Sequence, residues 1–329
     1  MPTSSFPGEA LELKSLEYLA EVDNYVKNNL DALIDKFLNQ FESYCRAVTQ
    51  MQEAGTKGPI GFINFSFLLT NILARRHIIR LDAYDENWYA DRTECSGEYE
   101  TGEFYTGLDL YVDALDSAWR PMYRGGTLRD IQQAIFEESK KYHFIVAELI
   151  RVGLRTAAEK SWFREIQRAP VFIILFGGYH DKVDILYKED TTPKDATEVK
   201  RYLEAKDQAV YTHEICRDLD LSGGDYTGAH LMFSDFSGCD FTDSWFTNTV
   251  ILFSNFSQTV LENVNLENTQ IFDTDFSGAS LENVNFRGAK LKHLNFTGAR
   301  LNNVKFADAI LAEELNFDQA ILKDTVLPY

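Results

Sequence analysis

In the last third of the chain, a large apolar residue recurs at every fifth position. The series runs unbroken through nineteen residues, from Leu221 to Leu311. From Gly224 onward, the position two residues before each of them is small or β-branched, except for Leu294, and the other three are mostly polar. A period of five matches neither the 3.6-residue period of a helix nor the two-residue period of a strand. The pattern predicts a chain that turns a corner every five residues, with the large and small side chains facing one axis.

The amino-acid sequence of the repeat resembles that of the pentapeptide-repeat family. Residues 279–283 (ASLEN) and 299–303 (ARLNN) are close to its consensus A(D/N)Lxx, and the resemblance covers about residues 219–327. It implies a right-handed quadrilateral β-helix of four pentapeptides per coil, here between five and six coils. One ladder of stacked rings is then expected at the strand spacing of about 4.8 Å; its members are Phe236, Phe256, Phe276 and Phe296. After Leu311 the register slips by one residue, as terminal repeats often do.

Two outward-facing surfaces of the predicted β-helix are unusual. The first, the acidic face, consists of Asp220, Asp240, Asp243, Glu262 and Glu282. Like charges on neighbouring strands repel, so their stacking suggests a basic partner; the alternative is a solvated surface. The second, the apolar patch, consists of Met232, Phe233, Leu252, Phe253 and Phe272. A water-exposed rod should not present such a patch, so we expect the N-terminal domain or another copy of the chain to cover it.

Beyond Glu282 the charge of the outward residues changes sign. This basic band consists of Arg287, Lys290, Lys292, Arg300 and Lys305. The family resemblance further implies a homodimer through the C-terminal coil, which would protect the open strand edges there.

The first two hundred residues have helical periodicity, and we expect a mainly helical domain with a few strands over 1–212, followed by the β-helix at 213–329. Apolar residues at steps of three and four predict one helix from Leu19 to Val48. Further helices are expected over 62–75, 127–158 and 192–210, and a strand over 77–84. The run 170–178 (PVFIILFGG) fits a buried strand or a short core helix. The helix at 192–210 is expected to lead into the first coil, whose open end needs a cap.

Candidate chemistry is sparse in this part. Residues 82–116 contain eleven acids and one base, and Asp109, Asp113 and Asp116 are spaced to share one helix face. A divalent-metal or basic-partner site is one interpretation; a solvated acidic surface is the favoured one. His143 lies near Glu138 and Glu148, but there is no HExxH motif, phosphate loop or nucleophile elbow. We therefore expect no enzyme, cofactor or metal, with a pocket joining His143 to Asp109 or Asp113 as the enzyme alternative.

Composition narrows the function classes. The 329 residues carry a net charge of −19, which disfavours direct nucleic-acid binding and favours a protein partner with a basic surface. No apolar run reaches membrane-spanning length, no signal peptide is recognisable, and the four cysteines lack metal or disulfide spacing, so we expect a cytoplasmic protein. The resemblance implies a DNA mimic that binds DNA gyrase or topoisomerase IV and protects it from quinolone antibiotics. The alternative is an interaction scaffold or regulator whose N-terminal helical domain binds a separate partner.

Overall fold

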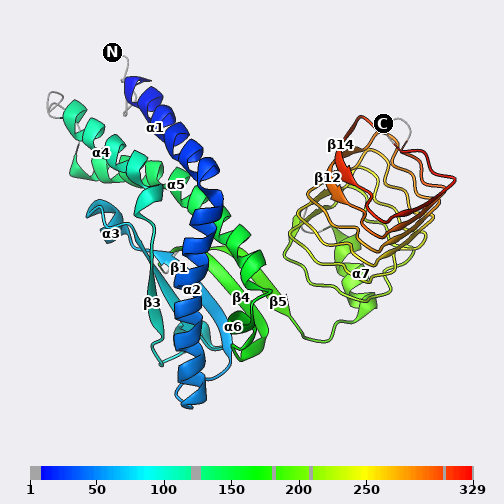
Figure 1. Cartoon of the computed structure of the whole chain (residues 1–329), viewed down its shortest axis with the longest axis horizontal. Helices are drawn as coiled ribbons and strands as arrows, with labels where there is room; N and C mark the ends of the chain where they lie inside the picture. Colours follow the sequence, from blue (N-terminus) through cyan, green and yellow to red (C-terminus); the bar gives the residue numbers. More distant parts are fainter. Residues whose placement is uncertain (1–8, 120–126, 180–182, 207–209, 307–308, 328–329) are drawn as a thin grey trace. The chain divides into compact units, whose positions relative to one another are not determined.

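The computed structural model describes residues 9–119, 127–179, 183–206, 210–306 and 309–327. It divides the chain into two compact units, residues 1–190 and 191–329 (Figure 1). The division lies earlier in the chain than the expected boundary at residue 212. The reason is that helix α7 (Ala196–Ala205) belongs to the C-terminal unit, where its Leu203 is buried in the core of the repeats.

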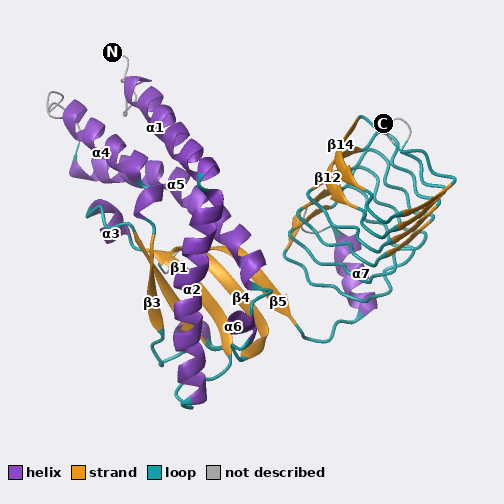
Figure 2. Cartoon of the chain, viewed as in Figure 1, coloured by secondary structure: helices purple, strands orange, loops and turns teal. Residues whose placement is uncertain are grey.

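The N-terminal unit contains a five-stranded mixed sheet and helices that cover more of the chain than the strands do (Figure 2). The strand order is β3-β2-β1-β4-β5, with β1 antiparallel to β2 and parallel to β4. The strands are β1 (Ile60–Phe67), β2 (Ile78–Tyr84), β3 (Ser96–Glu100), β4 (Arg168–Gly178) and β5 (Val183–Asp190). The helices are α1 (Glu9–Asn28), α2 (Leu30–Glu53), α3 (Leu69–Leu73), α4 (Thr106–Trp119), α5 (Leu128–Ala157) and α6 (Ser161–Arg164), with 3-10 turns at Trp88–Ala90 and Gly102–Phe104.

Two expectations for this unit are wrong. The single helix predicted from Leu19 to Val48 is interrupted at Asn29, between α1 and α2. The helix predicted over 62–75 is mostly strand β1, followed by the short α3. β1 is buried along most of its length, including the polar side chains of Asn64 and Ser66. The helix prediction did not account for the alternation of Ile63, Phe65 and Phe67 with these two polar residues, which is the two-residue period of a strand.

The other expectations hold with adjusted limits. The strand over 77–84 is β2, and the run 170–178 lies in strand β4. The helix over 127–158 is α5, whose first turn is closed by a capping box between Thr127 and Asp130. The expected helix over 192–210 is the shorter α7; the carboxylate of Asp195 caps it by accepting a hydrogen bond from the amide of Glu198.

The C-terminal unit contains a β-solenoid in which residues of neighbouring coils pair at an interval of twenty positions up to the pair of Asn285 and Lys305. One parallel sheet has six strands: β6 (Val210–Thr212), β7 (His230–Met232), β8 (Val250–Leu252), β10 (Gln270–Phe272), β12 (Lys290–Asn295) and β14 (Leu311–Asn316). A second sheet has four: β9 (Val260–Glu262), β11 (Ser280–Glu282), β13 (Arg300–Asn302) and β15 (Ile321–Lys323). The six passes of the first sheet correspond to about six coils.

The predicted filling of the solenoid is confirmed. Every large apolar residue of the five-residue series from Leu221 to Phe306 is buried, and Tyr211 and Cys216 extend the series backward. The predicted phenylalanine ladder exists: ring centroids are 5.2, 5.5 and 5.2 Å apart from Phe236 to Phe296, and Phe317 continues it at 5.1 Å.

The register slip lies earlier than expected. Asn285 pairs with Lys305, twenty residues on, whereas Lys290 pairs with Leu311, twenty-one residues on. The extra residue therefore falls between Lys305 and Leu311. As a consequence Ala312, not Leu311, takes the backbone register of the core residue Leu291.

Candidate binding surfaces

The acidic face lies along one side of the solenoid, but its charges come in separate pairs. In the backbone register, Asp220 lies beside Asp240 of the next coil, and Glu262 lies beside Glu282. The backbone position that continues from Asp240 is occupied by Val260, and two coils further on by Arg300. Hydrogen bonds from the hydroxyl and amide of Ser222 lower the pKa of Asp220, which keeps this exposed carboxyl ionised.

Asp243 begins a ladder of side-chain amides on this side. It accepts a hydrogen bond from Asn263 at 3.0 Å; Asn283 donates to Asn263 at 3.0 Å, and Asn303 donates to Asn283 at 2.8 Å. The fifth acid thus accepts a hydrogen bond from an uncharged amide on the next coil. The ladder replaces what would otherwise be a continuous row of charge.

Sequence analysis missed Trp245, two residues beyond Asp243. Its side chain is 61% exposed, although it precedes the buried Phe246. On the neighbouring coils it is flanked by Asp225 and Asn265. An aromatic residue at an outward position of the repeat is the signal that could have identified it, because tryptophan is enriched among residues that dominate binding energy.

The residues of the apolar patch lie on the adjacent strands β7, β8 and β10 and in the turns that follow β7 and β8. Met232, Leu252 and Phe272 occupy equivalent positions on successive strands and are half-buried. In the turns, His213 stacks on Phe233 and Phe233 stacks on Phe253, with centroid distances of 5.2 and 5.1 Å. We call these three rings the aromatic column. That the N-terminal unit or a second copy covers this surface stays a prediction.

The two phenylalanines of the aromatic column have unusual backbone conformations. The φ angles are +52° at Phe233 and +53° at Phe253, in the left-handed region that the equivalent turns elsewhere mostly fill with Gly, Asn or Asp. This conformation costs an ordinary side chain roughly 1–2 kcal/mol. Stacking between the rings offsets part of this cost. A strained conformation retained at two successive coils suggests a function for the side chains.

The same turn position is polar in the later coils. His293 lies between Asp273 and Glu314, with its Nδ1 3.2 Å from Asp273 Oδ1 and its Nε2 2.7 Å from Glu314 Oε2. In the basic band, Lys292 pairs with Glu313 at 3.4 Å and Arg287 approaches Glu267 at 4.0 Å. The aromatic column is thus confined to the early coils.

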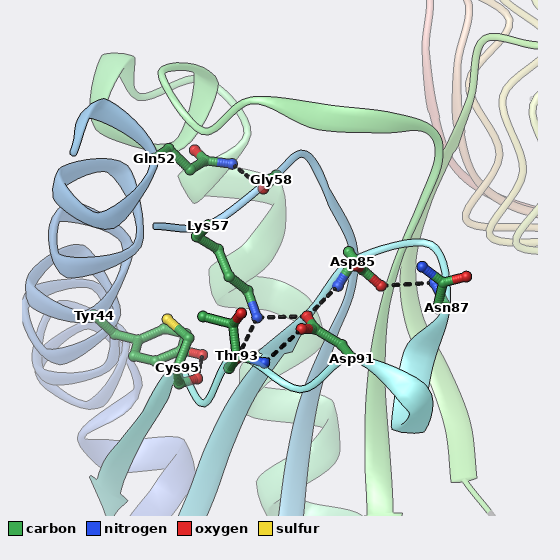
Figure 3. A network of polar contacts seen from close by, with 9 residues as sticks. All are labelled: Tyr44, Gln52, Lys57, Gly58, Asp85, Asn87, Asp91, Thr93 and Cys95. Carbon is green, nitrogen blue, oxygen red and sulfur yellow. Dashed lines mark hydrogen bonds and ion pairs between the residues drawn. The ribbon is translucent and has the colours of Figure 1, made fainter. Parts of the chain in front are cut away.

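In the N-terminal unit, acids of the segment 82–116 form ion pairs with bases of the same unit. The ammonium of Lys57 lies 2.5 Å from Asp91 Oδ2 and donates to the carbonyl of Thr93, and both charged side chains are almost completely buried (Figure 3). Asp91 also accepts hydrogen bonds from the backbone amides of Asp85 and Thr93. Burial raises the pKa of Asp91, but the bonds from Lys57 and these amides outweigh it and hold the pKa below its ordinary value.

Other acids of the segment 82–116 also form ion pairs with bases of the N-terminal unit. Asp82 pairs with Arg80, and Glu103 pairs with Lys36. Asp113 is exposed and pairs with Arg75. Among the residues that the structure describes, no group of three or more His, Cys, Asp or Glu side chains could hold a metal ion.

His143 is buried and stacks on Phe67 with a centroid distance of 3.8 Å. Burial and the neighbouring His77 lower its pKa to about 3. His77 Nε2 lies 3.0 Å from the carboxylate of Asp109, and both imidazoles contact the ring of Tyr105. The structure thus brings His143 and Asp109 to either side of one tyrosine, while Asp113 is bound to Arg75.

Sequence models of known families match the repeats. Residues 220–296 match the pentapeptide repeat region, and residues 279–324 match the pentapeptide repeats (8 copies). The C-terminal part of the chain therefore belongs to the pentapeptide-repeat family, as the resemblance predicted, and neither match extends into the first 219 residues. No curated protein matched the chain.

Solved structures similar to this chain are pentapeptide repeat proteins. Rfr23 from the cyanobacterium Cyanothece 51142 is 19% identical, with 34% of this chain and 86% of that chain covered and a TM-score of 0.28. A protein from the Arabidopsis thaliana thylakoid lumen is 17% identical, with 36% and 77% covered and a TM-score of 0.30. QnrB1, a plasmid-mediated fluoroquinolone resistance protein, is 17% identical, with 35% and 63% covered and a TM-score of 0.25. In the described residues, no helix has the length and apolar character needed to cross a bilayer.

Proposed function

We propose that the chain is a non-enzymatic protein-binding protein whose solenoid, a right-handed quadrilateral β-helix, presents the contact surface. The observation that carries this proposal is the aromatic column, in which Phe233 and Phe253 are held in a left-handed backbone conformation and partly exposed. Aromatic side chains are enriched in the buried centres of interfaces. Because stacking already orders these rings, they would lose little side-chain entropy when a partner binds.

The charge of the solenoid indicates a second property of the proposed partner, which is a basic surface. The acidic face extends from Asp220 to Glu282, the exposed Trp245 lies two residues beyond its Asp243, and the whole chain carries a net charge of −19. A partner with a basic surface would complement this side. The finer proposal is that this partner is a type II topoisomerase, DNA gyrase or topoisomerase IV, and that the solenoid acts as a DNA mimic. The separation of the acids into pairs and the basic band both oppose a continuous imitation of duplex charge.

The aromatic column can be tested with Phe233→Asn and Phe253→Asn combined, because asparagine suits the left-handed turn. Partners would be captured from the source cell with the full chain and quantified by mass spectrometry, with Gln258→Asn at an equivalent turn as the matched control. We expect the double variant to lose a partner that the control retains. Equal capture by all three proteins would contradict the proposal.

The topoisomerase proposal has its own test. Full-length protein would be titrated into gyrase supercoiling assays with and without a quinolone, beside a variant combining Asp240→Asn, Glu262→Gln and Glu282→Gln. We expect inhibition or protection by the native chain that the neutralised variant lacks. If the native chain has no effect at micromolar concentration, the partner is a different basic protein.

We also propose a homodimer through the last coil and a cytoplasmic location. β14 and β15 end their sheets, and the last coil exposes Ile310, Ile321 and Val326. The four cysteines are buried, and a reducing compartment would keep them as thiols. The alternative function, a scaffold or regulator whose N-terminal domain binds a separate partner, is favoured if the captured proteins persist when both solenoid surfaces are altered.

A further inference from the structure

A pocket of about 260 Å³ lies in the N-terminal unit, between α5 and the ends of β1 and β4. Phe67 contributes from the end of β1, and Phe176 and Gly177 from the end of β4. These two strands are parallel, so their carboxyl ends meet at this edge of the sheet. Ligands of sheets with parallel strands commonly bind at this edge. The remaining wall is formed mainly by one stripe of α5, from Lys140 to Arg151.

The imidazole of His143 is the unusual part of the lining of this pocket. Neither of its ring nitrogens has a hydrogen-bond partner within the described residues, although the side chain is buried. Buried polar groups in native proteins are nearly always bonded, so each exception needs an explanation. A neutral imidazole offers one N–H donor and one acceptor nitrogen. A ligand edge that carries both an acceptor and a donor would satisfy it.

The walls favour a flat ring. Phe67 stacks on His143, and Phe176 lies in T-shaped contact with the same imidazole. Phe144, one residue further along α5, also lines the pocket and is 67% exposed. A phenylalanine left in water beside an aromatic cavity can cover the second face of an inserted ring.

The charges at the rim favour a neutral ligand. Arg151 donates to the carbonyl of Ile185 at 3.0 Å and to Glu148 at 3.3 Å. Lys140 pairs with Glu137 at 2.5 Å. Both bases that could hold a phosphate are therefore already bonded, and the pocket adds the acids Glu148 and Asp184 to its lining.

We propose that this pocket binds a neutral heteroaromatic ligand of nucleoside size, with its ring against Phe144 and Phe67 and its polar edge on His143. The imidazole nitrogens are covered in the present arrangement, so the proposal requires the ring to turn toward the pocket when the ligand enters. This binding is separate from the solenoid and does not depend on the proposed partner function.

The test uses the purified full chain with adenosine, guanosine, cytidine and uridine as probes, and AMP as the charged comparison. Calorimetry would measure binding, and imidazole ¹⁵N shifts would report on His143. We expect at least one nucleoside to bind and shift the His143 nitrogens, and AMP to bind at least tenfold more weakly. Absence of binding by all four nucleosides at millimolar concentration overturns the proposal, as does AMP binding as tightly as its nucleoside.

Two variants locate the site. Phe144→Ala removes an exposed side chain and should fold normally; we expect at least a fivefold loss of affinity. His143→Gln keeps a donor and an acceptor at a shorter reach and should also weaken binding. Leu128→Ala, at an exposed position of α5 outside the pocket lining, is the control that should bind like the native chain. Unchanged affinity in both pocket variants would show that the ligand binds elsewhere.

Discussion

Phe233 stacks on Phe253 of the next coil, with ring centroids 5.1 Å apart and planes 6° from parallel, although both residues have positive φ angles. The positive φ angles of the pair cost free energy locally, whereas its stacked rings stabilise the contact between two coils. Replacing Phe253 with Asn should release roughly 1–2 kcal/mol of backbone strain and lose about 0.5–1.5 kcal/mol of aromatic contact. We therefore expect the free energy of unfolding to change by less than about 1 kcal/mol, measured by chemical denaturation.

Truncation of a ring in the inner phenylalanine ladder should instead lower the free energy of unfolding strongly. Phe276 is buried between Phe256 and Phe296, with centroids 5.5 and 5.2 Å away. Phe276→Ala would leave a cavity in the middle of the solenoid and should cost about 3–5 kcal/mol. Phe276→Leu, which restores most of the volume, is the matched control and should cost much less. Similar losses for Phe253→Asn and Phe276→Ala would contradict the distinction between outer and inner aromatic residues.

The buried pair of Lys57 and Asp91 predicts a large effect of removing one partner. Lys57→Met leaves the carboxylate of Asp91 buried without its cation and should destabilise the N-terminal unit by about 3–5 kcal/mol. The control is Lys27→Met, which removes the exposed pair with Asp23; it should cost less than about 1 kcal/mol. Denaturation followed by tryptophan fluorescence would compare them.

The same pair predicts acid sensitivity. Because the pKa of Asp91 is lower in the folded state, its contribution to stability is complete above the unfolded value of about 3.9 and is lost as the pH falls through the folded value. Asp91→Asn should therefore be less stable than the native chain at neutral pH, and the difference should shrink at acid pH. A constant difference across this range would show that ionisation of Asp91 contributes nothing.

His143 predicts a pH dependence at higher pH. Its folded pKa is about 3, below the unfolded value of about 6.5, so the unfolded chain binds an extra proton between these values. Stability should fall with decreasing pH by up to about 1.4 kcal/mol per unit below pH 6. His143→Phe should flatten this slope, whereas His230→Gln in the solenoid should leave the transition of the N-terminal unit unchanged. A native slope retained in His143→Phe would assign the effect to other groups.

The solenoid could be predicted from sequence because its signal is local and repeated. Each five-residue unit places one side chain such as Phe236 in the core, and nineteen repetitions leave no other consistent period. The N-terminal unit lacks such redundancy. β1 has only eight residues and alternates between apolar and polar residues over only part of that length, so its period is a weak signal. The single residue Asn29 divides the first two helices without a proline or glycine.

The candidate sites differ in the same way, because only those on the repeats could be predicted from a local pattern. The members of the apolar patch share the twenty-residue period, which predicted their contact. The pocket in the N-terminal unit brings together Phe67, His143 and Phe176 from three elements. Their proximity follows from the pairing of β1 with β4 and from the packing of α5, which no local pattern encodes. Trp245 lies at an outward position of the repeat, but its role as a contact residue follows from no charge pattern and shows only in its exposure.

Helix α7 makes the two ends of the solenoid unequal. Leu203 is buried with the core residues of the first coils, and the hydroxyl of Tyr211 in β6 donates to its carbonyl. The opposite end carries β14 and β15, which have no further strand beside them in the described residues. An assembly that grows by edge pairing needs two open ends in every subunit. With α7 covering the core at one end, an assembly that joined subunits at the other end would stop at a pair, so the fold opposes growth into a fibre.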